Sequence, residues 1–164
     1  MERSYLSKFF SLCFGGVGPR VKAHLYLILF FKKKNFFQMA KFFSDRMQRK
    51  YGLFISAKSS FSMSLDLKHP VGVVVGDGVK IGERVKIFQH VTLGGARLGD
   101  WQDNNYPEIG DDTVIFAGAI VVGKVKVGKN CVIGANAVVT KDVPDNSIAV
   151  GIPARIISKS KSDE

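Results

Sequence analysis

The sequence predicts an all-β solenoid of short parallel strands that follows an N-terminal α-helical segment. Three observations predict it: an aliphatic residue recurs every six positions, glycine often follows it, and a small or β-branched residue stands four places after it. A helix needs apolar residues at spacings of three and four, and hairpins need alternation with frequent turns. Strands joined by tight corners can instead stack as coils around one aliphatic core, although a β-sandwich with fortuitous spacing is the alternative. The aliphatic positions are Val75, Ile81, Ile87, Leu93, Ile109, Ile115, Val121, Val127, Ile133 and Val139.

Residues 1–51 form the predicted helical segment. Two stretches, 21–31 and 35–47, have helical character, and Phe36, Met39, Phe43 and Met47 follow the spacing of one helix face. We expect this segment to cap the open end of the solenoid, because every solenoid needs its terminal coil covered. Residues 52–157 form the expected β-helix domain, and residues 158–164 a flexible tail.

The positive charge is concentrated in the N-terminal segment. Residues 1–50 hold 11 Lys and Arg against 2 acidic residues, whereas residues 51–164 hold 13 against 12. A basic, aromatic-rich helix pair can cap the fold or lie on an anionic membrane surface. The apolar stretch 25–31 is too short to span a bilayer, and no nucleic-acid-binding module accompanies the charge. Two cysteines make no disulfide framework, so we expect a cytoplasmic protein, with the inner face of the membrane as an option.

Two breaks interrupt the period of six. Leu67 and Val75 are eight residues apart, so the chain bulges around His69 and re-aims that side chain. Leu93 and Ile109 are sixteen residues apart, so residues 95–107 leave the coil as a polar excursion loop that carries the only tryptophan. Loops of this length in a compact domain are usually functional, and both breaks therefore mark candidate site residues.

Four motifs resemble the hexapeptide-repeat acyltransferases, in particular their serine acetyltransferase branch. They are His69-Pro-Val-Gly-Val-Val-Val-Gly76, Gln89-His-Val-Thr-Leu-Gly-Gly95, Ile133-Gly-Ala-Asn-Ala-Val-Val139 and Val150-Gly-Ile-Pro-Ala-Arg155. The resemblance implies a left-handed parallel β-helix, acetyl-CoA as co-substrate and no metal. It also implies a homotrimer whose active sites lie between subunits under the excursion loop.

By this resemblance His69 matches the general base of the family. Imidazole suits the role because its pKa near 6.5 leaves it mostly neutral at pH 7, and a positioned base is worth about 10²–10⁴ in rate. A structural histidine at a corner is the alternative. The residues expected at the acceptor are Lys68, His90, Trp101, Asn105 and Tyr106. The residues expected along acetyl-CoA are Gly94, Gly95, Ala117, Gly118, Ala135, Lys141 and Arg155, although corner geometry and solvation also explain them.

The chain departs from that branch at residues that matter for the acceptor. The acidic partner of the base is replaced by Phe54, the aspartate before the base by Lys68, and an Arg-His pair of the loop by Asn105 and Tyr106. An amino acid's ammonium group would be repelled by Lys68. These changes favour a hydroxyl of a sugar in surface-polysaccharide (capsule or exopolysaccharide) synthesis, as a small molecule or on a lipid. Serine O-acetylation in cysteine biosynthesis is the alternative.

Two further classes compete with an acetyltransferase. A zinc hydratase on this fold needs three histidine ligands, and the predicted β-helix holds only His69 and His90. A scaffold that has lost catalysis is supported by Phe54 and opposed by His69 together with the glycine-rich groove. The acceptor, the acyl group and the partner that orients His69 stay open at this point.

Overall fold

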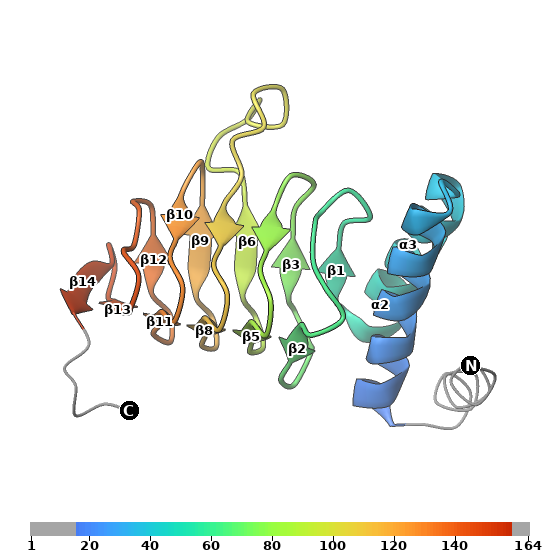
Figure 1. The fold of residues 1–164 in the computed structure, drawn as a ribbon, viewed down its shortest axis with the longest axis horizontal. Helices are drawn as coiled ribbons and strands as arrows, with labels where there is room; N and C mark the ends of the chain where they lie inside the picture. Colours follow the sequence, from blue (N-terminus) through green and yellow to red (C-terminus); the bar gives the residue numbers. More distant parts are fainter. Residues whose placement is uncertain (1–15, 159–164) are drawn as a thin grey trace.

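The computed structural model describes residues 16–158 of the chain. A helical hairpin stands at one end of a stack of β-coils, and β14 lies at the other end (Figure 1). Neither helix of this described part is long and apolar enough to cross a membrane.

The hairpin consists of α2 (Val17–Lys33) and α3 (Phe37–Tyr51), which are the two helices that the sequence predicts. Lys32 and Lys33 occupy the last turn of α2, where cations meet the negative end of the helix dipole. Gly52 ends α3 in the left-handed conformation with φ of 61°, which a residue without a Cβ adopts at no steric cost. α3 packs against β1, the first strand of the solenoid.

The prediction of which residues form the inner face of α3 is partly wrong. Met47 is buried, but Phe36 is 62% exposed and Met39 is 41% exposed. The buried residues are Ala40, Ser44 and Met47, so the inner face is rotated away from the aromatic stripe. Small residues face inward because α3 lies close to β1, where the hydroxyl of Ser44 donates to the carbonyl of Ile55 at 2.5 Å.

Three parallel sheets form the sides of the solenoid. From β3 to β9 each strand pairs in parallel with the strand three places further along the chain, so each of these coils contributes one strand to each sheet. The first sheet holds β1 (Phe54–Ile55), β3 (Val74–Val75), β6 (Thr92–Gly94), β9 (Ile120–Val122) and β12 (Val138–Val139). The second holds β4 (Lys80–Ile81), β7 (Glu108–Ile109) and β10 (Lys126–Val127). The third holds β2 (Asp66–Leu67), β5 (Lys86–Ile87), β8 (Val114–Ile115), β11 (Val132–Ile133), β13 (Ser147–Val150) and β14 (Arg155–Ser158).

The period-six aliphatic residues form the core, as the sequence predicts. All ten of them are buried, and so are the small residues four places after them, from Val79 to Ala137. The parallel pairing excludes the β-sandwich. The left hand of the coil stays a prediction from the resemblance.

The last two strands differ from the rest. β13 and β14 pair in antiparallel fashion, with Val150 opposite Arg155, so β14 turns back instead of starting another coil. The sequence did not predict this turn, and Ser158, expected as the first tail residue, ends β14. Residues 159–164, the rest of the expected tail, lie outside the described part.

The turns from the third sheet to the first sheet form one corner of the solenoid, which we call the histidine corner (residues 68–73, 88–91, 116–119 and 134–137). Successive turns are joined by backbone bonds, such as His90 N–H to the Val71 carbonyl at 2.9 Å and Asn136 N–H to the Ala117 carbonyl at 2.9 Å. Each turn holds a residue with positive φ, a region that favours Gly, Asn and a few other residues. These residues are Gly72, His90, Gly118 and Asn136.

Candidate active site

His69 lies in the widened turn between β2 and β3, at the histidine corner. Its backbone has φ of 51°, and its carbonyl accepts a hydrogen bond from Val71 N–H at 2.7 Å. The side chain is exposed, and within residues 16–158 its ring has no hydrogen-bond partner. The imidazole is therefore available to a ligand.

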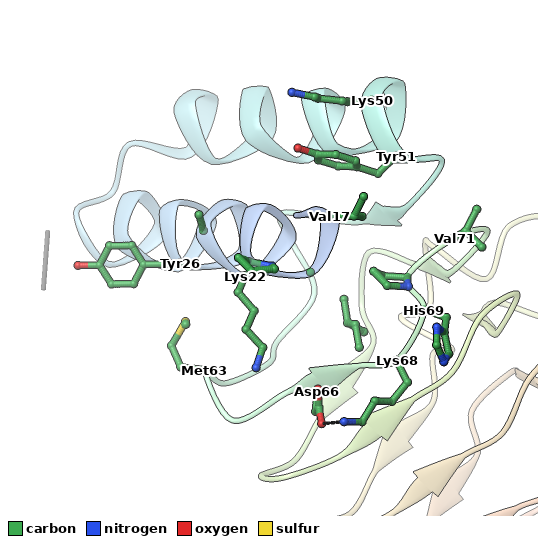
Figure 2. Close-up of a pocket in the computed structure, with 15 residues that line it drawn as sticks. Val17, Lys22, Tyr26, Lys50, Tyr51, Met63, Asp66, Lys68, His69 and Val71 are labelled. Carbon is green, nitrogen blue, oxygen red and sulfur yellow. Dashed lines mark ion pairs between the residues drawn. The ribbon is translucent and has the colours of Figure 1, made fainter. Parts of the chain in front are cut away.

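A cavity of about 970 Å³ lies between α2 and the turn that carries His69 (Figure 2). Its walls are largely apolar, with Val17, Tyr26, Met63 and Leu67 among them. Among residues 16–158, the charged groups that line it are Lys22, Lys50, Lys68 and a single carboxylate, Asp66. The cavity beside the histidine is thus both roomy and positively charged.

Asp66 pairs with Lys68 and not with His69. The Lys68 ammonium lies 2.8 Å from an Asp66 carboxylate oxygen, and the pair is drawn in Figure 2. This hydrogen bond lowers the pKa of Asp66, and the charges of Lys68, Lys22 and Lys86 lower it further against the opposing effect of burial. Part of the Lys68 charge is therefore neutralised within the chain. The position of the family's orienting carboxylate, Phe54, is half-buried in β1.

His90 lies on the same corner, one coil further along. Its ring covers the α-carbon of Gly72, so closely that a Cβ at Gly72 would overlap the imidazole. Gly72 follows His69 by three residues, which brings the second histidine against the turn that carries the first. His90 is exposed, and its predicted contact with an acceptor stays a prediction.

The small residues expected along acetyl-CoA fall into two groups. Ala117, Gly118 and Ala135 occupy successive turns of the histidine corner. Gly94 ends β6 and Gly95 follows it at the next corner, where a Cβ at Gly94 would meet nothing within 4 Å. Of the two cationic residues, Lys141 lines a small hollow of about 190 Å³ with Pro153, Ala154 and Ile156, while exposed Arg155 begins β14.

The excursion loop, residues 95–107, rises from the stack between β6 and β7 (Figure 1), as the sequence predicts. The Asp100 carboxylate holds it together by accepting the amides of Ala96 at 2.6 Å and Arg97 at 2.7 Å. The Asn105 side chain also donates to this carboxylate, at 3.2 Å. These bonds, the Arg97 amide first, lower the pKa of Asp100. Asn105 thus has a structural task in the loop.

The two aromatic loop residues differ in their surroundings. Trp101 is 68% exposed, whereas Tyr106 is half-buried with its ring packed over Gly76 and Gly78. Tyr106 therefore anchors the base of the loop. Substrate contact by either residue stays a prediction.

The structure places most of the predicted site residues on two different corners of one chain, whereas Arg155 lies in β14. His69, Lys68, His90, Ala117, Gly118 and Ala135 are at the histidine corner. The loop residues and Gly94 and Gly95 are at the corner between the first and second sheets, which we call the loop corner. One chain does not bring them together, so a site that uses both corners needs a second chain.

Sequence reasoning missed the helical wall of the cavity. Lys22, Tyr26, Lys50 and Tyr51 line it, but they lie in the segment that the sequence predicts as a cap or a membrane-surface helix pair and not as part of the site. One signal was available for the ion pair: Asp66 and Lys68 are two residues apart, a separation that puts both side chains on the same side of an extended chain. Within the described part of the chain, no three His, Cys, Asp or Glu side chains gather as a metal site needs.

Comparisons with known proteins agree with the fold. Residues 106–141 match the family described as bacterial transferase hexapeptide (six repeats). The serine acetyltransferase of Bacillus pumilus is 40% identical over 135 residues, covering 82% of this chain and 61% of that protein. That of Staphylococcus xylosus is 37% identical over 139 residues, covering 85% and 63%.

The similar solved structures are also serine acetyltransferases. A serine acetyltransferase in complex with CoA superposes with a TM-score of 0.77 at 28% identity, covering 90% of this chain and 60% of that one. Soybean serine acetyltransferase complexed with serine superposes with a TM-score of 0.79 at 31% identity and the same coverage. The chain therefore spans about three fifths of the length of the relatives it matches.

The expected sugar acceptor is wrong, because the similar proteins are serine acetyltransferases. The structure shows why the prediction failed. Lys68, which we expect to repel an ammonium group, is bound by Asp66, and Tyr106, which we expect at the acceptor, is packed over two glycines.

Proposed function

Since residues 106–141 are bacterial transferase hexapeptide repeats and most of the chain is similar to serine acetyltransferases, we propose that it transfers the acetyl group of acetyl-CoA to the hydroxyl of L-serine. The observation that carries the proposal is the position of His69. Its unpartnered imidazole stands in the wall of a cavity that is large enough to admit a small acceptor.

His69 acts as general base in this reaction. Neutral imidazole takes the proton of the serine hydroxyl while the oxygen attacks the thioester carbonyl. The resulting tetrahedral intermediate collapses with cleavage of the carbon–sulfur bond. The proton passes from the imidazolium to the departing CoA thiolate, which leaves O-acetylserine, free CoA and a neutral histidine. No covalent enzyme intermediate is needed.

The cavity supplies groups for the acceptor's carboxylate. Lys22 extends from α2 toward Asp66 (Figure 2), and Lys50 and Lys68 also line the space. Because Asp66 neutralises part of the Lys68 charge, Lys22 is the stronger candidate to pair with the carboxylate. The same neutralisation reduces the repulsion that the ammonium group of serine would meet at Lys68.

The small residues support binding of acetyl-CoA. The pantetheine arm is thin and needs exposed backbone more than bulky contacts, and Gly94 leaves open space where a side chain would stand. Ala117, Gly118 and Ala135 provide small side chains in successive turns. Lys141 and Arg155 are exposed and can meet the phosphates of CoA as a point charge and a forked donor.

A homotrimer accounts for the separation of the two corners. In a cyclic arrangement the histidine corner of one chain faces the loop corner of its neighbour, and each of the three interfaces then holds one complete site. Trp101 would cover the acceptor bound at His69 of the adjacent chain.

The proposal is tested by free CoA thiol released from acetyl-CoA with L-serine and with L-serinamide, which lacks the carboxylate. We expect release with L-serine, and loss of at least about 100-fold in His69→Asn, which tolerates the left-handed backbone. Lys22→Gln should raise the KM for L-serine more than that for L-serinamide, whereas Lys33→Gln, on the outer end of α2, should change neither. No release with L-serine, or release that survives His69→Asn, would reject the proposed function.

A further inference from the structure

The hairpin presents an apolar surface that the fold does not use. Phe36, Met39 and Phe42 are 62%, 41% and 47% exposed, near the turn between the two helices. Phe42 contacts Phe43 edge to face at 5.4 Å, and Phe43 stacks on Phe31 at 5.6 Å. We call these five residues the aromatic face. Phe31, Phe43 and Phe42 form a continuous set of rings, and Phe36, Met39 and Phe42 are in solvent. A folded protein seldom leaves such an apolar surface exposed without a function.

Cations surround this face. Between residues 17 and 51 the chain holds nine Lys and Arg side chains and one acidic residue, Asp45, which gives a charge of +8. Lys33, Lys34, Lys41 and Arg46 are exposed. Lys33 and Lys34 lie between Phe31 and Phe36 of the aromatic face in the sequence, and Lys41 and Arg46 flank Phe42 on α3.

Within the part of the chain that the structure describes, the position of the hairpin leaves the aromatic face accessible. The hairpin forms the end of the stack opposite β14 (Figure 1), and α3 packs on β1 through Ala40, Ser44 and Met47. The aromatic face uses other positions of α3. It lies far along the stack from the excursion loop.

We propose that the aromatic face binds the surface of an anionic lipid bilayer. Exposed aromatic side chains next to lysines favour the boundary between headgroups and acyl chains, where rings enter the apolar layer and ammonium groups meet lipid phosphates. A second copy of this chain is a poor occupant, because it would bring two hairpins of charge +8 together. Neither helix is long and apolar enough to cross the bilayer, so the hairpin binds along the surface.

The test is cosedimentation with vesicles of phosphatidylcholine, with and without about a third of phosphatidylglycerol. We expect binding to the anionic vesicles alone, weakened by added salt because exposed charges are screened. Replacing Phe36, Met39 and Phe42 by serine should abolish it. Lys33→Glu with Lys34→Glu should weaken it at least about tenfold, since each lysine near an anionic surface contributes roughly a fivefold gain in affinity.

The matched control is Lys124→Glu with Lys126→Glu, two exposed lysines at the second sheet that change the net charge by the same amount. This variant should still bind. Equal loss in both charge variants would mean that only net charge matters and would overturn the proposal, as would failure of the native chain to bind. If the serine variant instead reduces the size of the native assembly without vesicles, the face is an interface between copies.

A second measurement reports insertion directly. With Trp101→Phe and Phe42→Trp combined, brominated lipids should quench the fluorescence of the new tryptophan at the aromatic face. They should leave Trp101 of the native chain unquenched, because the excursion loop lies away from the hairpin (Figure 1). Quenching of Trp101 but not of the residue at 42 would place the membrane on the wrong side of the molecule. Circular dichroism of each variant checks that the fold is kept.

Discussion

Lys68 and Asp66 form an ion pair of 2.8 Å beside the turn that carries His69. The two residues stand on the same side of the chain around β2, and among the described residues 16–158 no carboxylate pairs with His69. A pair of this kind, partly exposed, contributes only about 0.2–1 kcal/mol to stability, so its main effect is on the charge of the cavity.

The ion pair makes the stability of the fold depend on pH, and the direction follows from the lowered pKa of Asp66. Lys68 lowers the pKa of Asp66 in the folded chain below its ordinary value of 3.8. A carboxyl group with a lowered folded pKa stabilises the fold above its unfolded pKa, and that contribution is lost as pH falls through the folded pKa. The difference in melting temperature between the native chain and Lys68→Gln should therefore be present at pH 6 and shrink below about pH 4. A difference that grows on acidification would contradict the assigned pair.

Gly72→Ala should destabilise the fold through two separable effects. Alanine at a φ of 66° costs about 1–2 kcal/mol, and its Cβ would also overlap the ring of His90. We expect His90→Ala to remove the second cost and leave the first, as denaturant unfolding in a double-mutant cycle would show. Additive effects of the two substitutions would mean that the imidazole does not lie on Gly72.

Asp100→Ala should loosen the excursion loop while the stack keeps its stability. The carboxylate accepts the amides of Ala96 and Arg97, and both bonds are lost in the variant. Hydrogen exchange of residues 96–105 should become faster, with the melting temperature nearly unchanged. Asp103→Ala, at an exposed loop carboxylate, is the matched control and should leave exchange unaltered.

Mixed assemblies test whether the two corners of different chains meet. Chains with His69→Asn and chains with Trp101→Ala should each have low activity alone. Co-expressed, they should recover part of the activity, because some interfaces then pair a native His69 with a native loop. Absence of recovery, with mixed assembly confirmed by differently tagged chains, would indicate that each site lies within a single chain.

Much of the solenoid could be predicted from the sequence because one rule repeats in every coil. The residue at each period-six position has the same inward direction, so Val75 and Ile133 could be assigned to the core without any structure. The excursion loop was equally clear, since sixteen residues cannot fit one six-residue side. β14 was not predictable, because an antiparallel return depends on pairing with β13 and its sequence has no period of its own.

The site was predictable in part. The widened turn pointed to His69, but the partners of a side chain depend on neighbours that the period does not specify. Lys68 was interpreted by its charge alone, although Asp66 stands two residues before it and so lies on the same side of an extended chain. Phe36 and Met39 were assigned to an inner helix face because their spacing is helical. Such spacing shows that residues share a face, but it does not show which face turns inward. Ala40 and Ser44 are buried instead, because their small side chains let α3 lie close to β1.

The antiparallel return of β14 also limits how the protein can assemble. A coil that ends on an open strand offers its backbone to the next molecule, and stacked coils could then polymerise end to end into fibres. β14 occupies the free edge of β13 with a strand of opposite direction that cannot continue the winding, while α3 covers the other end. A chain shortened before Arg155 would keep its folded coils but would expose the edge of β13, which could then pair with a strand of another molecule.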